Sequence, residues 1–558
     1  MSGKATTRSL IVVSYYYRIM QERLVMKFYR RLTSIFAAAA GIFVIAIALG
    51  LNPALAQKRG GELHTVVFPE PAHLGLGISP QIGTYVISSK IYQSLMKYDF
   101  DLNPIPVLAT EWSASSDGKT YTFKLRKGVR FHDGKPMTAH DVVFSCNEVL
   151  RKHNALARKV FPRTEKIYAS DDHTVVFQFK EPYPAFLSMF DVASVPVLPK
   201  HLYEGTDYPK NEWNSKPVGT GPFKFSEWKK GSHVKLVRND DYWKPGLPYL
   251  DAIWIHMLPD AASRSLALEE GRIHFTSWTT IQGYDHDRLK AMPHLEMTTK
   301  GYELMGTMMW LEVNHRRAPM NDVRFRKALM HAVDREFIRD NIYFGLGKIP
   351  GGPVSTTTRY YDASVQANWD HNPDKAKKIL DEMGLKEDSN GVRIELDFLP
   401  LSAFGEEQLR VGEYVQQALK KVGIKANIVK TDPAGWMSKM GNWEYDIAIN
   451  YMGQYGDPEL GVARSYITGN IKKGVPFNNM AGYSKPHIDD LFARGAVEMD
   501  QKKRAAIYSD LQKALIDDQA YIWLLEFELP HFINTKYKNV IVNGLGNKDD
   551  FEGVYVEQ

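Results

Sequence analysis

The spacing of apolar residues changes along the chain and divides it into a strand-rich part and a helix-rich part. Between about Gly61 and Leu258, the stretches "GELHTVVF", "HTVVFQFK" and "HVKLVRN" are dense in aromatic and β-branched residues. This composition, with apolar and polar positions alternating, predicts strands. "TYTFKLRKGVRFHDG" predicts two more strand segments that end at an Asp-Gly turn. We therefore expect the earlier part of the chain to be rich in β-structure.

From about Asp322 onward, apolar residues recur at helical spacing. "DVRFRKALMHAVDREF" predicts an amphipathic helix with Asp322 as its N-cap, and Gly345 lies near the stop. "NPDKAKKILDEMGL" has an Asn cap, a proline at the first helical position and Gly384 past the end. "EEQLRVGEYVQQALKKVGIKANIVK" predicts a helix, a stop at Gly423 and then a strand. Because strands and helices alternate, the predicted fold class is α/β, with two α/β lobes and a β-rich extra segment in the first.

The N-terminal part has the order of a secretory signal peptide. A basic start from Lys27 to Arg31 precedes a long uncharged apolar run, and Ala54-Leu55-Ala56 follows. We expect cleavage after Ala56. Residues 1–25 fit no part of this pattern, so we expect Met26 to be the natural start.

A membrane anchor is the alternative interpretation of the same run, because the run is long for a signal peptide. Asn52 and Pro53 break the helix just before the small residues, which favours cleavage. The only cysteine is Cys146, so no lipid anchor is expected at the cleavage site and no disulfide within the chain. We expect an exported, periplasmic and unanchored protein.

The net charge of +6 belongs to the targeting segment. Of the 70 Lys/Arg and 64 Asp/Glu residues, seven and one fall within residues 1–56, which leaves the mature chain with equal numbers of both. A neutral mature chain gives no reason to expect a nucleic-acid partner.

An exported hydrolase is the alternative from a different functional class. The chain has no G-x-S-x-G and no H-E-x-x-H motif. His132, Asp133, His140 and Asp141 could ligate a metal, but an Asp-Gly turn and the chemistry of a helix start explain the two carboxylates better. Cys146 lies at helical spacing among apolar residues, which indicates a buried structural side chain. No catalytic residue, cofactor or metal is therefore predicted, and the hydrolase stays open only because catalytic residues can lie far apart in sequence.

Four stretches carry a resemblance to a known family. They are "LATEWSASSDGKTYTFKLRKGVRFHDGKPMTAHDVVFS", "PVGTGPFKFSEWKKGSHVKLVRNDDYW", "IWIHMLPDAASRSLALEEGRIHF" and "NDVRFRKALMHAVDRE". Together they resemble the extracellular solute-binding protein family 5, the dipeptide/oligopeptide/nickel-type binding proteins of ABC importers. The resemblance spans nearly the whole mature chain and is specific for the family but not for the ligand.

The resemblance implies a periplasmic binding protein of the class II, cluster C type, with two lobes that close on a ligand about a hinge. The chain is then expected to cross between the lobes near "MMWLEVN" and near "WLLEFELP", two extended apolar stretches that could pair as hinge strands. It implies no enzyme activity, a monomer, and docking on the permease subunits of an ABC transporter in the inner membrane. The implied segments are a signal peptide (1–56), domain I in three parts (57–100, 215–305 and 528–558), a β-rich subdomain (101–214) and domain II (306–527).

The loop "YMGQYGDP" is the first candidate for ligand contact, because loops after strands often bind ligands. It resembles the "W-x-G-D-x-x-D-P" loop of peptide-binding relatives, whose first Asp takes the α-ammonium of the peptide. Gln454 stands at that position, and a neutral amide leaves a buried ammonium unpaired. We therefore expect Gln454 to face the ligand and to disfavour free N-termini. Tyr451 and Tyr455 belong to the same loop, whereas Asp457 before Pro458 is expected mainly to shape the turn.

Three aromatic residues elsewhere are weaker candidates. Trp278 lies in a polar loop where the family places a ligand loop of domain I, and Trp436 lies where relatives often carry an aromatic residue. Tyr85 is a further N-terminal candidate. Packing in the core is the alternative for each of them. The ligand stays open between a peptide, an opine or modified amino acid, and a small glycoside or oligosaccharide.

Overall fold

The computed structural model describes residues 59–557 apart from 80, 278–279, 367–368 and 402–405. The predicted signal peptide, its cleavage after Ala56 and the start at Met26 lie outside the described residues, and so does Trp278.

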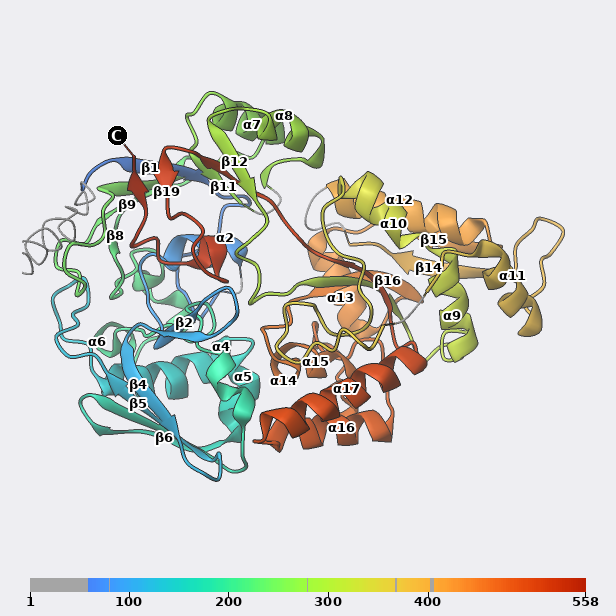
Figure 1. Cartoon of the computed structure of the whole chain (residues 1–558), viewed down its shortest axis with the longest axis horizontal. Helices are drawn as coiled ribbons and strands as arrows, with labels where there is room; N and C mark the ends of the chain where they lie inside the picture. Colours follow the sequence, from blue (N-terminus) through green and yellow to red (C-terminus); the bar gives the residue numbers. More distant parts are fainter. Residues whose placement is uncertain (1–58, 80, 278–279, 367–368, 402–405, 558) are drawn as a thin grey trace, which may run out of the picture. The chain divides into compact units, whose positions relative to one another are not determined.

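A seven-stranded mixed sheet forms the centre of the part that we call lobe I (Figure 1). Its strands come from widely separated segments of the chain. Strand β10 pairs in parallel with β1 and antiparallel with β9. The apolar side chains of β1 and β10 that share one face pack into a buried core with those of β9. In spatial order the strands are β12 (Leu295–Thr298), β18 (His531–Asn534), β11 (Phe275–Thr276), β1 (Glu62–Val66), β10 (Ala252–His256), β9 (His233–Arg238) and β8 (Phe223–Lys229).

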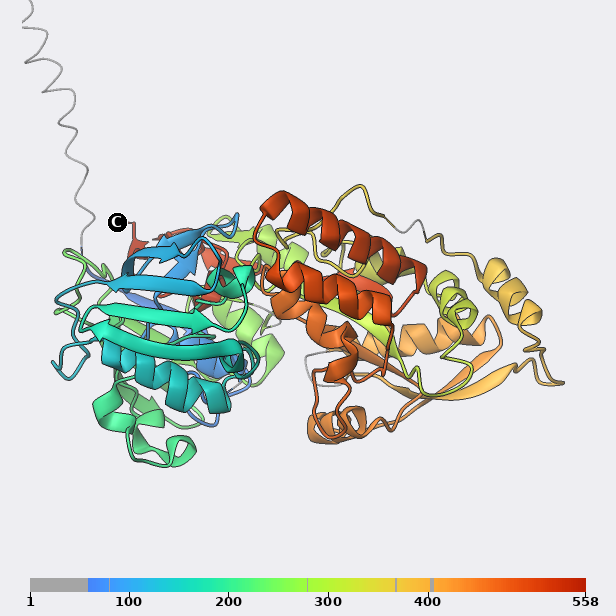
Figure 2. The same ribbon diagram turned by 90° about the horizontal axis from the view of Figure 1, so that it is seen from below.

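A separate four-stranded antiparallel sheet, also counted in lobe I, confirms the predicted β-rich segment (Figure 2). Helix α3 (Ala139–Phe144) packs against it and continues as a π-helical segment over Ser145–Leu150. The backbone N–H of Thr138 donates to the Asp141 carboxylate at 2.8 Å, which is the predicted helix-start chemistry, and Cys146 is buried in the core as predicted. The strands in order are β4 (Ala109–Ala114), β5 (Thr120–Leu125), β7 (Thr174–Phe179) and β6 (Thr164–Asp171).

Lobe II is built on a five-stranded sheet flanked by long helices. Asp322 and Asn372 accept backbone hydrogen bonds at the starts of two of these helices, as their sequences predict. The strands in order are β15 (Ile424–Ile428), β14 (Ile394–Leu399), β16 (Ile447–Met452), β13 (Met308–Val313) and β17 (Ile522–Glu526). The main helices are α9 (Val323–Ala332), α11 (Pro373–Glu382), α12 (Glu406–Lys420), α13 (Pro433–Asn442), α16 (Pro486–Val497) and α17 (Gln501–Asp517).

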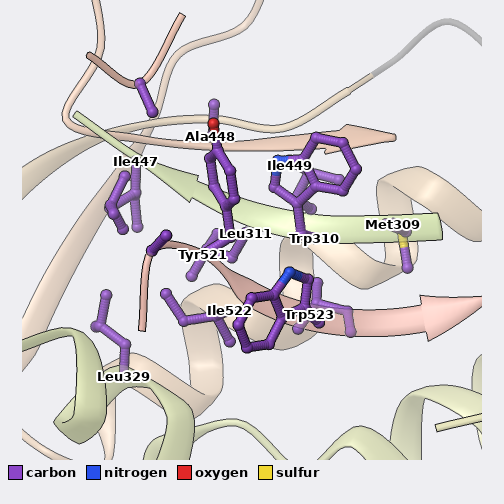
Figure 3. Packing of buried hydrophobic residues seen from close by; sticks show 14 of the residues in the cluster. Met309, Trp310, Leu311, Leu329, Ile447, Ala448, Ile449, Tyr521, Ile522 and Trp523 are labelled. Atoms are coloured by element: carbon purple, nitrogen blue, oxygen red, sulfur yellow. The ribbon is translucent and has the colours of Figure 1, made fainter. Parts of the chain in front are cut away.

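The centre of lobe II is a dry core around β13 (Figure 3). Trp310 and Leu311 on β13 lie between the side chains of β16 and those of β17, including Ile449 and Trp523. Burying side chains of this size contributes about 1.5–3 kcal/mol each relative to exposure. The core therefore holds β13 and β17, the two strands that lead to and from lobe I, in one rigid unit.

Shorter elements complete the fold. In lobe I, β2 and β3 form a hairpin and β19 pairs with β20. These elements are α2 (Ile82–Ser88), β2 (Met96–Tyr98), β3 (Pro104–Pro106), α4 (Arg151–His153), α5 (Ala157–Val160), α6 (Lys200–Tyr203), α7 (Ala261–Glu269), α8 (His286–Lys290), α10 (Arg335–Phe337), α14 (Pro458–Gly461), α15 (Ala463–Tyr466), β19 (Tyr537–Lys538) and β20 (Tyr555–Val556).

The chain passes between the lobes just before β13 and just after β17, in the two extended apolar stretches predicted as hinge strands. The strands of the seven-stranded sheet lie in the three predicted parts of domain I, those of the four-stranded sheet in the predicted β-rich subdomain, and those of the five-stranded sheet in the predicted domain II. The β2–β3 hairpin spans the predicted boundary at residue 100. The exact segment boundaries remain predictions.

Candidate ligand cavity

A cavity lies where the two hinge strands meet both lobes, and we call it the hinge cavity. It measures about 630 Å³, part of which is open to solvent. Lobe II, the hinge strands and lobe I all contribute to its walls. The lining residues are Ile281, Gly283, His286, Thr307, Tyr343, Phe344, Leu346, Glu407, Gln408, Tyr451, Phe527, Glu528, Leu529 and Pro530.

The walls of the hinge cavity are largely aromatic. The rings of Tyr343 and Phe527 have centroids 5.5 Å apart, and Tyr451 meets Phe527 edge-on at 6.2 Å. On the side of lobe I, the ring of His286 lies 6.3 Å from Phe344. Such a lining offers flat apolar surface and ring faces to a ligand.

Several buried polar atoms in these walls have no hydrogen-bond partner among the described residues. They include the Tyr343 hydroxyl and the Oε1 atom of Gln408, on residues that are 8% and 6% exposed, and the ring nitrogens of His286. Buried polar groups are nearly always paired, because leaving one unpaired costs about 1–3 kcal/mol. Burial raises the pKa of Tyr343, so the phenol stays protonated. These atoms are available to a ligand that enters the cavity.

Glu407 links the walls of the two lobes. It lies in the first turn of α12, and its carboxylate accepts a hydrogen bond from the Gly283 backbone N–H at 3.3 Å. The Glu407 carboxylate also raises the pKa of the Tyr343 phenol beyond the effect of burial. A ligand here would therefore meet a carboxylate that contacts both lobes.

Gln454 lies elsewhere, beside a small cavity of about 240 Å³ inside lobe II. Its side-chain oxygen accepts from the Ser355 N–H at 2.6 Å and from the Thr358 hydroxyl at 3.3 Å, and its amide nitrogen donates to the Pro353 carbonyl at 2.9 Å. The side chain thus fastens the segment 353–358 to the loop after β16. No bond to a ligand is needed to satisfy its oxygen.

Asp457 is held by the side chain of Arg504 on α17. The two oxygen–nitrogen distances are 2.6 and 2.9 Å, and both side chains are almost fully buried. Asp457 also caps the short helix α14 by accepting from the Glu459 N–H at 3.0 Å. Through these contacts Asp457 shapes the turn, the role that the sequence predicts for it.

The same loop contacts lobe I. Glu459 accepts a hydrogen bond from Arg163 at 2.6 Å, and Leu460 is buried in the core of the four-stranded sheet. Burial raises the pKa of Glu459 to about 7. We call the stretch from Gln454 to Leu460 the Gln454 loop; it forms a contact between the lobes that is separate from the hinge cavity.

The structure separates the aromatic candidates. Of these, Tyr451 lines the hinge cavity, whereas Tyr455 packs against the core of the four-stranded sheet. Trp436 is 2% exposed within the core of lobe II, although its indole nitrogen has no hydrogen-bond partner among the described residues. Tyr85 on α2 is largely buried, and both Tyr455 and Asp191 raise its pKa beyond the effect of burial, so these groups lie near one another. Among the candidates that lie in the described part of the chain, Tyr451 is the one in the lining of the hinge cavity.

Sequence reasoning missed most of the cavity. Tyr343, Phe344 and Gln408 carried no motif, and Glu407 was visible only as an acidic residue at a helix start. Phe527 lies in a stretch predicted as a hinge strand, and Tyr451 was predicted as a ligand contact; these two predictions pointed toward the cavity.

The chain belongs to the bacterial extracellular solute-binding proteins, family 5, whose family model (described as the middle part of the family) matches residues 103–473. This match confirms the resemblance drawn from the sequence, and with it the two-lobed binding-protein fold and the role of substrate-binding component of an ABC importer.

Relatives of the chain bind different solutes. It is 29% identical to the oligopeptide-binding protein AppA of Bacillus subtilis over 84% of this chain and 86% of the relative. A solved structure of B. subtilis AppA with a nonapeptide matches with a TM-score of 0.77 and 26% identity, covering 90% of this chain and all of the other. The AgaA protein of A. tumefaciens R10, solved with agropinic acid, matches with a TM-score of 0.76 and 25% identity over 89% of this chain and 99% of the other. The fold is thus shared by proteins solved with different ligands, a nonapeptide in one and agropinic acid in the other.

The described residues contain no helix that is long and apolar enough to cross a membrane. They also contain no group of three or more His, Cys, Asp and Glu side chains placed to hold a metal ion.

Proposed function

We propose that this protein captures a small solute in the hinge cavity and delivers it, as a periplasmic monomer cleaved after Ala56 and without a lipid anchor, to permease subunits in the inner membrane. Closure of the two lobes about the hinge strands encloses the solute, and the protein performs no chemistry on it. The solute is peptide-like, opine-like or an oligosaccharide, the three classes that the sequence leaves open.

One observation carries the choice of the hinge cavity. Its walls come from both lobes and hold buried polar atoms, among them those of Tyr343 and Gln408, that have no partner among the described residues. A ligand that supplies those partners stabilises the arrangement in which the lobes meet, because it binds that arrangement better than one in which they are apart. The neighbouring rings supply the apolar area that makes a small-molecule site strong.

Gln454 has a supporting role in this proposal. Its neutrality still disfavours an α-ammonium group beside position 454, since the Gln454 amide carries no charge to pair with it. Its three side-chain hydrogen bonds go to residues 353–358, so its contribution to affinity comes through the position of that segment. Tyr451, Tyr455 and Tyr85 remain proposed contacts, with Tyr451 the best placed.

An exported hydrolase remains the alternative function. The hinge cavity contains one histidine and two carboxylates but no Ser, Cys or Lys nucleophile among its described lining residues. Turnover of any compound in a broad hydrolase screen, lost on mutation of a single nucleophile, would favour the enzyme over the binding protein.

Phe344→Ala tests the location. Phe344 is 39% exposed and lines the cavity, so its removal should cost little stability while deleting a ligand-facing ring. The solute released by denaturing purified protein is identified by mass spectrometry and titrated back by calorimetry. We expect the affinity of the Phe344→Ala variant for the solute to fall by about fivefold to thirtyfold, since an aromatic contact contributes about 1–2 kcal/mol.

Tyr168→Ala is the matched control, because Tyr168 lies on β6 in the four-stranded sheet and does not line the cavity. Its affinity should equal that of the wild type. Small-angle scattering should show a smaller radius of gyration when the solute is bound. Equal affinity of the Phe344 variant would place the site elsewhere, and an unchanged radius would contradict closure.

A further inference from the structure

The lining of the hinge cavity is unbalanced in charge. Glu407 and Glu528 bring two carboxylates, and no Lys or Arg stands among the described lining residues. Lys348 pairs with Glu528 at 3.2 Å from outside the lining. No basic side chain among the described residues forms an ion pair with Glu407, which therefore remains the unneutralised charge of the site.

His286 does not supply the missing cation. The Ile281 carbonyl and the Glu407 carboxylate both favour the protonated imidazole, but burial outweighs them and lowers the pKa of His286 below its usual value. At neutral pH the ring is uncharged and offers the cavity an apolar face.

The Glu407 carboxylate meets a helix N-terminus and a backbone donor from the other lobe. It stands in the first turn of α12, where the partial positive charge of a helix N-terminus stabilises a carboxylate, and the Gly283 N–H donates to it from the other lobe. The Gln408 Oε1 atom adds an acceptor beside it, and the Tyr343 hydroxyl can accept as well as donate. The wall around Glu407 is therefore rich in acceptors.

The aromatic residues complete a site of recognisable chemistry. The rings of Tyr343, Phe344, Tyr451 and Phe527 all belong to the lining. Ring faces attract organic cations by about 0.5–2 kcal/mol each, with the larger values where water is excluded. A carboxylate among such rings suits an amine, a guanidinium or a quaternary ammonium group.

We propose that the hinge cavity holds a cationic organic group of the captured solute, with Glu407 as its counter-charge and the four rings around it. An anionic group would lie beside Glu407 with no basic side chain to pair with, which is strongly unfavourable in a partly buried site. The inference rests on the proposed function and assigns to that same site the charge of its ligand. It also gives the chain a carboxylate for ammonium recognition at a place other than position 454.

Three probes of similar shape test the charge preference: phenethylamine, 2-phenylethanol and phenylacetate. Each is titrated against the full mature protein by calorimetry or by ligand-observed NMR at pH 7. We expect the amine to bind at least about tenfold more tightly than the alcohol, because hydrogen bonds to charged groups exceed neutral ones by that order. Phenylacetate should bind most weakly.

Glu407→Gln keeps the shape of the side chain and removes its charge, so the preference for the amine over the alcohol should shrink to about threefold or less. Glu413→Gln is the matched control, since Glu413 lies exposed on the same helix and does not line the cavity. Its preference should equal that of the wild type. Rising salt concentration should weaken binding of the amine to the wild type and leave binding of the alcohol unchanged.

Binding of phenylacetate or the alcohol as tightly as the amine would overturn the inference, as would a Glu407→Gln variant with the full preference. Absence of amine binding at millimolar concentration would overturn it too. These failures differ from failure of the proposed function. A protein that releases an anionic solute on denaturation still captures solutes, whereas one that carries none and keeps its radius with every member of a broad solute pool does not.

Discussion

The Gln454 loop and the hinge cavity both join the two lobes, but two polar side chains of the loop are paired where two of the cavity are not. In the Gln454 loop the side chains of Gln454 and Asp457 are bonded to the protein itself. In the hinge cavity the Tyr343 hydroxyl and the Gln408 oxygen have no partner among the described residues. A polar side chain that is already paired holds the fold together, whereas an unpaired one that also lines a cavity is available to a ligand.

The sequence predicts the Gln454 loop as a ligand-binding site for a related reason. Gly, Gln, Asp and Pro after an apolar strand are typical of binding loops, but the same residues also build tight, internally bonded turns. Sequence shows the chemistry of a side chain and not whether another part of the chain has already used it. For Asp457 the partner is Arg504, 47 residues later.

Removing Arg504 should have the largest effect on stability. Arg504→Met leaves the buried Asp457 carboxylate without its cation, and breaking a buried pair in this way costs about 3–5 kcal/mol. Urea denaturation followed by circular dichroism measures the loss in free energy of unfolding. Lys502→Met, on the exposed face of the same helix, should change it little. If Arg504→Met unfolds with the wild-type midpoint, the loop is not held by this pair.

Gln454→Ala should lower the free energy of unfolding by less than Arg504→Met does. It should change stability more than it changes affinity for the solute. The substitution leaves the buried Ser355 N–H and the Pro353 carbonyl without partners, at about 1–3 kcal/mol for such a buried group. Gln417→Ala, an exposed change on α12, is the control. A variant with unchanged unfolding but much weaker solute binding would show instead that Gln454 contacts the ligand directly, as the sequence suggested.

The pH dependence of closure should give the smallest effect. Burial raises the pKa of Glu459 to about 7, from an ordinary 4.5. If the lobes part, Glu459 regains water and its pKa falls toward the ordinary value. Closure then takes up a proton, so the closed form should be favoured at pH 5 and should lose population as the pH rises through 7.

Small-angle scattering at pH 5 and pH 8 without solute measures this shift. The radius of gyration should be slightly larger at pH 8 in the wild type and independent of pH in Glu459→Gln. Arg163→Gln should strengthen the pH dependence, since the Arg163 guanidinium stabilises the charged carboxylate. A wild-type radius that shrinks with rising pH would contradict the assignment.

Much of the fold could be predicted from local patterns. The caps at Asp322 and Asn372, the helix start at Asp141 and the β-rich segment all follow from short stretches of sequence, and each is present. The family motifs supplied the order of the segments and the two crossings between lobes. These features depend on residues close together in the chain, where propensity and spacing act directly.

The cavity could not be predicted in the same way. Gly283, Tyr343, Glu407 and Phe527 come from four distant segments, and only the packing of the lobes brings them together. For Trp436 the sequence left ligand contact and core packing open, and the side chain lies in the core of lobe II. Which side chains remain unpaired is decided by tertiary contacts that no local pattern records.

The position of β18 has a consequence for the order in which the lobes can form. In the seven-stranded sheet, β18 lies between β11 and β12 and pairs with both, although it is encoded after the whole of lobe II. Until the last part of the chain is present, no strand lies between β11 and β12, whereas the sheet of lobe II is complete once Glu526 is present. Lobe I must therefore wait for almost the last residues of the polypeptide, and a truncated product would carry a finished lobe II beside an open-edged, aggregation-prone first lobe.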